Sequence, residues 1–131
     1  MTKSEEILEI LKEFKSSHSE VEACMVAKKG LEGVIMFPES FKKDVAELWE
    51  PLGSTIDEIL CIISEKGQYC LDKAFFEMLG YSVSFNILCN SDTAFIVFAR
   101  STKDSDAYAY LSKISQDTAK TRQKILGIIE G

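Results

Sequence analysis

Four cysteines and a single histidine are the residues of this chain best suited to metal binding or nucleophilic chemistry. The cysteines are Cys24, Cys61, Cys70 and Cys89, and none forms a CxxC pair, while His18 stands alone in "SSHSE". Zinc sites are built from closely spaced ligand pairs, so this spacing does not favour one. Apolar neighbours, as in "ACMV", "LCII" and "ILCN", instead predict small buried side chains. We therefore predict no metal site, and a redox role is the less favoured alternative.

The sequence contains no constellation typical of an enzyme active site. A Ser-His-Asp arrangement would depend on His18, whose polar neighbours predict a solvated loop. The phosphate-binding pattern GxxxxGK[ST] does not occur, so the chain does not resemble a GTPase itself. Arg100 could act as an arginine finger on a partner GTPase, although an arginine at a strand end more often pairs with a carboxylate. We predict no catalytic or cofactor-binding residues, and a protein that is not an enzyme.

The composition predicts one folded domain over residues 1–131. Hydrophobic residues make up 46 % of the 131 residues and charged residues 27 %, a balance typical of globular proteins. The net charge of −6 argues against a nucleic-acid partner and against anionic membranes. No apolar run approaches the roughly 20 residues of a transmembrane helix, and "MTKSEEILEI" lacks the pattern of a signal peptide. We therefore expect a cytoplasmic protein without a transmembrane segment.

The first 38 residues predict a helix followed by a hairpin. In "TKSEEILEILKEF", Thr2 and Glu5 have the spacing of a capping box. Ile7, Leu11 and Phe14 recur at helical intervals, so they predict one buried face. The apolar runs "VEACMVA" and "VIMF" are then joined by "KKGLEG", whose two glycines favour a hairpin.

A long helix is predicted for residues 40–65, although "ELWEPLGSTIDEIL" contains a proline. At 100° per residue, the apolar side chains before and after Pro51 lie within about 80° of one another, which favours one continuous helix kinked at Pro51. Such a kink costs about 3 kcal/mol, because the proline lacks an N–H and its ring crowds the preceding turn. The rival interpretation is a break near Glu50 to Ser54, with a second helix starting at "STIDEIL".

Three strands and a last helix follow. Residues 70–79 fit either a helix or a strand, and we favour a strand at 74–79. "YSVSFNI" alternates strictly and predicts a half-exposed strand with Ser82, Ser84 and Asn86 on the solvent side. "TAFIVFA" is apolar throughout and predicts a central strand covered on both faces. The last helix is expected to begin near Asp104 or Ser105 and to run to the C-terminus.

The predicted order α-β-β-α-β-β-β-α gives an α+β domain with a five-stranded antiparallel sheet. This order resembles the roadblock/LC7 family over nearly the whole chain. The leading helix "EEILEILKEF" and the hairpin in "VEACMVAKKGLEGVIMFPES" carry the resemblance, with the long second helix, the three-strand meander and the closing helix. The resemblance implies a roadblock/LC7-like (profilin-like) sandwich.

The resemblance also implies a function. Roadblock/LC7 proteins are homodimers or heterodimers whose second helices pair across the dimer axis and whose sheets often join edge to edge. They bind Ras-like small GTPases as regulators, or serve as scaffolds, and carry no cofactor. The expected interface residues lie on the second helix: Phe41, Val45, Leu48, Trp49, Leu52, Ile56 and Leu60.

Two alternatives stay open from the sequence. Trp49 can lie at the interface, where tryptophan is over-represented among energetically important residues, or it can fill the domain core. The chain can also be a small-molecule-sensing module of the profilin-like, PAS or GAF type. Such a module needs an apolar pocket between sheet and helix, for which Phe75, Phe76, Phe85 and Phe95 are the candidates.

Overall fold

The computed structural model describes residues 2–28, 34–65, 73–78, 80–89, 93–101 and 106–131. Helices and strands follow the predicted order, except that the second and last helices are each divided, and the α+β class is confirmed. The elements are α1 (Lys3–Ser17), β1 (Val21–Lys28), β2 (Ile35–Phe37), α2 (Phe41–Asp44), the 3-10 turn η2 (Ala46–Leu48), α3 (Trp49–Glu65), β3 (Lys73–Met78), β4 (Tyr81–Cys89), β5 (Thr93–Arg100), α4 (Ala107–Lys113) and α5 (Ser115–Glu130).

The five strands form one antiparallel sheet in the order β2-β1-β5-β4-β3. β5 lies at the centre, and every side chain from Thr93 to Ala99 is buried. The prediction of a central strand covered on both faces is therefore confirmed. β2 and β3 form the two edges of the sheet.

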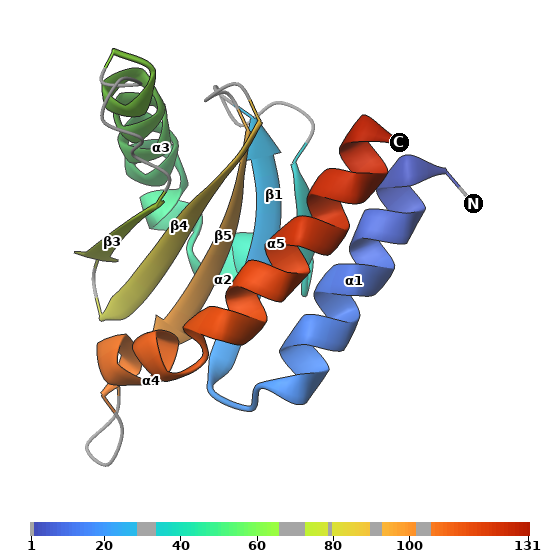
Figure 1. Cartoon of the computed structure of the whole chain (residues 1–131). Helices are drawn as coiled ribbons and strands as arrows, with labels where there is room; N and C mark the ends of the chain where they lie inside the picture. Colours follow the sequence, from blue (N-terminus) through green and yellow to red (C-terminus); the bar gives the residue numbers. More distant parts are fainter. Residues whose placement is uncertain (1, 29–33, 66–72, 79, 90–92, 102–105) are drawn as a thin grey trace.

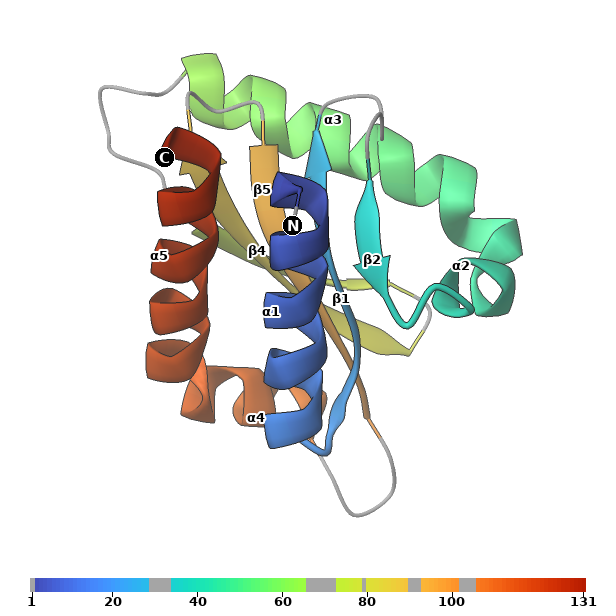
Figure 2. The same cartoon turned by 90° about the vertical axis from the view of Figure 1, so that its right-hand side faces the viewer.

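Helices cover both faces of the sheet (Figures 1 and 2). α3 lies across one face, and α1, α4 and α5 lie on the other. The side chains of each strand alternate between two cores. On β5, for example, Ile96 faces α3, whereas Phe95 and Val97 face α1 and α5. We call these the α3 core and the α5 core.

α1 begins with the predicted capping box. The Thr2 hydroxyl accepts a hydrogen bond from the Glu5 amide (3.2 Å), and the Glu5 carboxylate accepts one from the Thr2 amide (3.4 Å). The two bonds satisfy amides that have no partner within the helix. α1 packs beside α5, where Lys3 Nζ donates to the carbonyl oxygen of Gly131 at 2.7 Å.

The predicted single helix with a kink at Pro51 is wrong. α2 ends at Asp44, Val45 leaves the helical region (φ −114°, ψ 28°), and η2 then leads into α3 at Trp49. Pro51 is the third residue of α3, where an amide has no acceptor within the helix, so the missing N–H removes no helical hydrogen bond. The rival break at Glu50–Ser54 is also wrong, because the chain bends at residues 45–48.

The last helix is also divided where the sequence predicts continuity. Asp106, rather than Asp104 or Ser105, caps α4: its Oδ1 accepts from the Ala109 amide at 3.2 Å. Residues 104 and 105 lie outside the described residues. Ile114 (φ −92°, ψ 12°) separates α4 from α5, and the two helices run in different directions (Figure 1).

The ambiguous segment at 70–79 is a strand where the structure describes it. β3 pairs with β4 over its whole length, with Phe75 opposite Ser84. The favoured strand at 74–79 is confirmed for residues 74–78, and residue 79 lies outside the described part.

β4 is buried on both faces, so the prediction of a half-exposed strand is wrong. Its polar side chains Ser82, Ser84 and Asn86 are at most 7 % exposed, because they lie on the face that α4 and α5 cover. Burial is tolerated because these groups bond to one another and to the strand: Asn86 Nδ2 donates to Ser84 Oγ and to the Phe95 carbonyl, both at 3.1 Å. Alternation alone could not distinguish this polar stripe from a solvated face.

Candidate functional site

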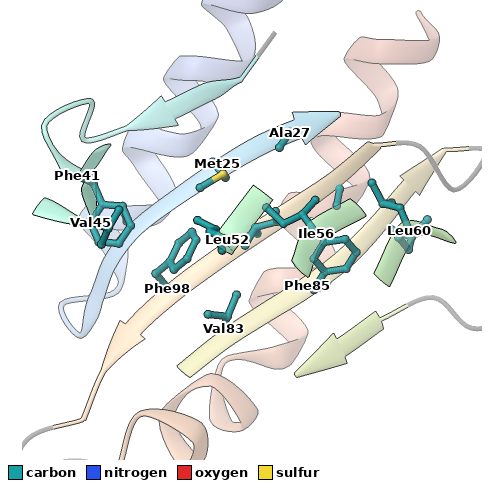
Figure 3. Close-up of a cluster of buried hydrophobic side chains, with 14 residues drawn as sticks. Met25, Ala27, Phe41, Val45, Leu52, Ile56, Leu60, Val83, Phe85 and Phe98 are labelled. Atoms are coloured by element: carbon teal, nitrogen blue, oxygen red, sulfur yellow. The ribbon is translucent and has the colours of Figure 1, made fainter. Parts of the chain in front are cut away.

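Most of the side chains predicted for the partner interface lie inside the chain. Five of the seven pack in the α3 core and are at most 4 % exposed: Phe41, Val45, Leu52, Ile56 and Leu60. Figure 3 shows them above Phe85 and Phe98 of the sheet. In this arrangement these five side chains have almost no surface left for a partner. The second helix as an interface stays a prediction, but its exposed side chains would have to carry it.

The spacing of the buried residues explains their position. Leu52, Ile56 and Leu60 are four residues apart, which places them on one side of α3. Phe41 anchors the preceding α2, because its ring centroid lies 5.0 Å from that of Phe98 and 5.5 Å from that of Tyr81. These contacts hold the whole segment 41–60 against the sheet.

Trp49 differs from these core residues. Its side chain is half-buried at the start of α3, and Lys42 Nζ lies 5.0 Å from the centroid of its ring. The indole packs against the α3 core and also borders a surface groove with Met36 and Pro38. Trp49 therefore contributes to the core and keeps a surface that a partner could contact. The side chain of Leu48, the remaining predicted residue, lies outside the described part of the structure.

Among the described side chains of α3, Thr55, Ile59 and Ile62 form a flank that the sheet leaves partly exposed. Their spacing of four and three residues places them on one side of the helix, about 60° to 120° around the axis from the buried Ile56. Thr55 and Ile59 are half-buried, and Ile62 is 53 % exposed. We call this surface the α3 flank. The sequence analysis did not single out Ile62, although the spacing of these three residues was a usable signal.

β3 adds a second apolar element at the edge of the sheet. It is the longer of the two edge strands, with six residues against three in β2. Ala74, Phe76 and Met78 lie on the face that α3 covers and are half-buried. An edge strand presents N–H and C=O groups that another strand can pair with. The two edges are thus the places where a further strand could extend the sheet.

His18 links two helices and does not lie in a solvated loop. It follows the last residue of α1, and its Nδ1 lies 2.8 Å from the Phe14 carbonyl oxygen. Because a carbonyl oxygen can only accept, Nδ1 carries the proton. Nε2 lies 3.1 Å from Oδ2 of Asp117 on α5. The neighbouring Ser17 hydroxyl donates to the Glu13 carbonyl rather than to His18, so His18 does not activate Ser17 as a nucleophile.

The cysteines divide into a buried and an exposed class. Cys24 is fully buried, and its burial raises the pKa of the thiol to about 12. Cys61 is exposed on α3, so the prediction of a buried side chain is wrong there. Cys70 and the side chain of Cys89 lie outside the described part of the structure.

Arg100 lies near an aromatic ring, and its expected pairing with a carboxylate stays a prediction. Among the described ion pairs none involves Arg100, and its guanidinium carbon lies 5.5 Å from the ring centroid of Tyr81.

Within the described ranges, no group of three or more His, Cys, Asp or Glu side chains could hold a metal ion. No described helix is long and apolar enough to cross a membrane.

Comparison with known proteins identifies the fold. No model of a known protein family matches the chain, and no curated protein matches it. Among solved structures, MglB of Myxococcus xanthus superposes with a TM-score of 0.65 at 13 % identity, covering 95 % of each chain. MglC of the same organism gives a TM-score of 0.56 at 12 % identity, covering 84 % of this chain and 93 % of MglC. At these identities the likeness establishes the fold, and the roadblock/LC7-like fold expected from the order of elements is confirmed.

Proposed function

We propose, from the roadblock/LC7-like fold that the chain shares with MglB and MglC, that this protein is a dimeric regulator or scaffold that binds a Ras-like small GTPase. The fold alone does not define an activity. Support comes from the family that the sequence resembles, whose members dimerise, bind such GTPases and catalyse no reaction of their own.

The observation that carries the proposal is the α3 flank. Ile62 is one of two large hydrophobic side chains exposed in the described part of the chain, and it lies in line with the half-buried Thr55 and Ile59. A second copy of α3 packed along this flank would bury all three residues on both helices. Helices pack in this way through side chains spaced three and four residues apart. β3, with its half-buried apolar face, offers the edge through which the two sheets would join.

Sedimentation equilibrium of the full chain at micromolar concentrations tests the dimer. Ile62→Glu places a charge in the proposed seam and should give a monomer, whereas the wild type should be a dimer. Tyr108→Glu is the matched control, because Tyr108 is 50 % exposed on α4, on the opposite face of the sheet. It should leave the dimer intact. A monomeric wild type, or an Ile62→Glu variant that still dimerises, would contradict the proposed interface.

The GTPase is tested separately. The small Ras-like GTPases of the source organism are immobilised, loaded with GDP or with a non-hydrolysable GTP analogue, and mixed with the full chain. We expect one GTPase to retain the protein in a nucleotide-dependent manner, without hydrolysis by the protein itself. If the protein dimerises and no GTPase retains it in either state, the GTPase part of the proposal is rejected.

The ligand-sensing alternative was based on four phenylalanines that were expected to line one apolar pocket, and the structure does not bring them together. Phe75 and Phe95 contribute to the α5 core, whereas Phe76 and Phe85 contribute to the α3 core on the opposite face of the sheet. The four rings therefore do not surround one apolar pocket. A regulator that acts through protein contacts is the better-supported function.

A further inference from the structure

A hollow lined by both charged and apolar side chains lies on the face of the sheet opposite α3, between its β3–β4 corner and α5. Its volume is about 390 Å³, which is within the range of small-molecule sites. β3 and β4 form the floor, with Lys73 opposite Asn86 and Phe75 opposite Ser84 in the strand register. α5 forms a wall that includes Lys120 and Arg122.

The charge of this hollow is opposite to that of the chain. Lys73, Lys120 and Arg122 line it, and no aspartate or glutamate of the described residues does, although the chain carries a net charge of −6. The described ion pairs, Lys12–Glu9 and His18–Asp117, involve none of the three cations. Glu77, the next β3 residue on the same face after Phe75, accepts a hydrogen bond from the Ser82 hydroxyl. The three positive charges therefore have no protein counter-ion within the described ranges.

The polar groups of the hollow are held in place by the fold. Arg122 Nε donates to the Ile87 carbonyl, which fixes the guanidinium, and its other N–H groups have no acceptor in the part of the chain that is described. The buried Ser84 hydroxyl accepts from Asn86 Nδ2 at 3.1 Å, so its own hydrogen is available to donate. Preorganised donors beside positive charges suit an anion that accepts several hydrogen bonds.

Phe75 gives the hollow an apolar part. The side chain is half-buried in the floor, and its ring meets Tyr108 edge to face with centroids 5.5 Å apart. We propose that this hollow binds a small phosphate-bearing molecule. The phosphate lies among Lys73, Lys120 and Arg122, and an attached planar group lies on the Phe75 ring. Phosphate accepts bonds from all of these donors, and an aromatic ring is a suitable surface for a planar group.

Backbone NMR titrations of the full chain test the proposal with adenosine monophosphate, inorganic phosphate and adenosine as probes. Adenosine monophosphate should shift the amide signals of Ser84, Asn86 and Arg122 in a saturable manner. Inorganic phosphate should bind the same site more weakly, and adenosine more weakly still. Adenosine binding as tightly as its monophosphate, or no saturable shift with either phosphate, would overturn the proposal.

A pair of double variants separates this site from general charge attraction. Lys73 and Lys120 are exposed, so Lys73→Gln with Lys120→Gln should leave the fold intact and weaken binding of adenosine monophosphate about tenfold. Lys113→Gln with Lys124→Gln removes the same charge from exposed positions that do not line the hollow, and should leave binding within about twofold. Equal weakening in both doubles would overturn a defined site. Lys73 also belongs to β3, the edge through which the two sheets would join, so sedimentation of both double variants shows whether weaker binding accompanies a change in the dimer.

Discussion

Two isoleucines of α3 allow the core and the exposed flank of the helix to be compared by the same substitution. Ile56 is 0 % exposed and contacts the sheet, whereas Ile62, six residues later, is 53 % exposed. Isoleucine to alanine removes the same three carbon atoms at both positions. Any difference between the two variants therefore reports the surroundings of the side chain rather than the chemistry of the change.

The expected magnitudes follow from burial. Removing three buried carbon groups costs about 2.4 kcal/mol at about 0.8 kcal/mol each, and the remaining cavity raises the loss for Ile56→Ala to about 3–4 kcal/mol. In a chain of this length that loss lowers the melting temperature by roughly 10–15 °C. Ile62 has less surface to lose, and alanine favours the helix by a few tenths of a kcal/mol, so Ile62→Ala should cost no more than about 1 kcal/mol in the monomer.

Urea unfolding and calorimetry at several protein concentrations measure both effects. Ile56→Ala should lose the same stability at every concentration, since its contacts lie within one chain. The deficit of Ile62→Ala should grow as the concentration rises, because dimerisation stabilises the folded wild type more than the variant. A loss below about 1 kcal/mol for Ile56→Ala would refute the core assignment. A large, concentration-independent loss for Ile62→Ala would place Ile62 in the core and remove the α3 flank.

Four further predictions concern the ends of helices and the cysteines. Pro51→Ala should change the free energy of unfolding by less than about 1 kcal/mol, because Pro51 lies in the first turn of α3; a gain near 3 kcal/mol, seen by urea unfolding, would instead indicate a proline within a helix. Asp106→Ala should cost about 1 kcal/mol by removing the cap of α4, whereas Asp106→Asn should cost less; equal losses would contradict a role in capping. Iodoacetamide should label Cys61 in the folded protein and Cys24 only on unfolding, as mass spectrometry would detect. Burial raises the pKa of the Cys24 thiol from 9.0 to about 12, so the buried thiol contributes its full stability only below pH 9.0. As the pH rises above that value, Cys24→Ala should lose less stability than the wild type. Equal losses in the two proteins would mean that the thiol ionises normally in the folded chain.

Local sequence patterns predicted an element correctly where the pattern alone determines whether its side chains are buried or hydrogen-bonded. The continuous apolar run of β5 requires cover on both faces, and the structure places it at the centre of the sheet. Thr2 and Glu5 form the capping box because both groups belong to the same turn. In these cases no distant part of the chain is needed to decide the outcome.

The breaks in the second and last helices could not be predicted in this way. Val45 and Ile114 are ordinary apolar residues in continuous apolar stripes, without a neighbouring proline or glycine. Both are buried, and the chain changes direction at each of them. Packing against the sheet favours the bend over a straight helix, and periodicity carries no information about this competition.

The burial of the polar side of β4 also could not be predicted from the local pattern. Ser84 and Asn86 predicted a solvent-exposed side of the strand, because small polar residues usually lie at the surface. They are buried because α4 and α5 return to this face, a contact between residues more than twenty positions apart. The mutual hydrogen bond of the two side chains makes this burial tolerable. The sequence contains the residues of the hollow, but only the fold brings them together.

Periodicity likewise could not separate core from interface on α3. An apolar stripe shows that one side of a helix is covered, but a sheet of the same chain and a second copy leave the same pattern. The structure assigns Leu52, Ile56 and Leu60 to the sheet, so an interface must use side chains that the sheet leaves exposed. The proposed surfaces thus lie on opposite faces of one sheet, with Ile62 on one side and Lys73 and Lys120 on the other. Ile62 lies on the face opposite the hollow, whereas Lys73 also belongs to β3, the edge proposed to join the two sheets. Measuring the dimer and ligand binding on the same variants therefore shows which of the two proposals fails.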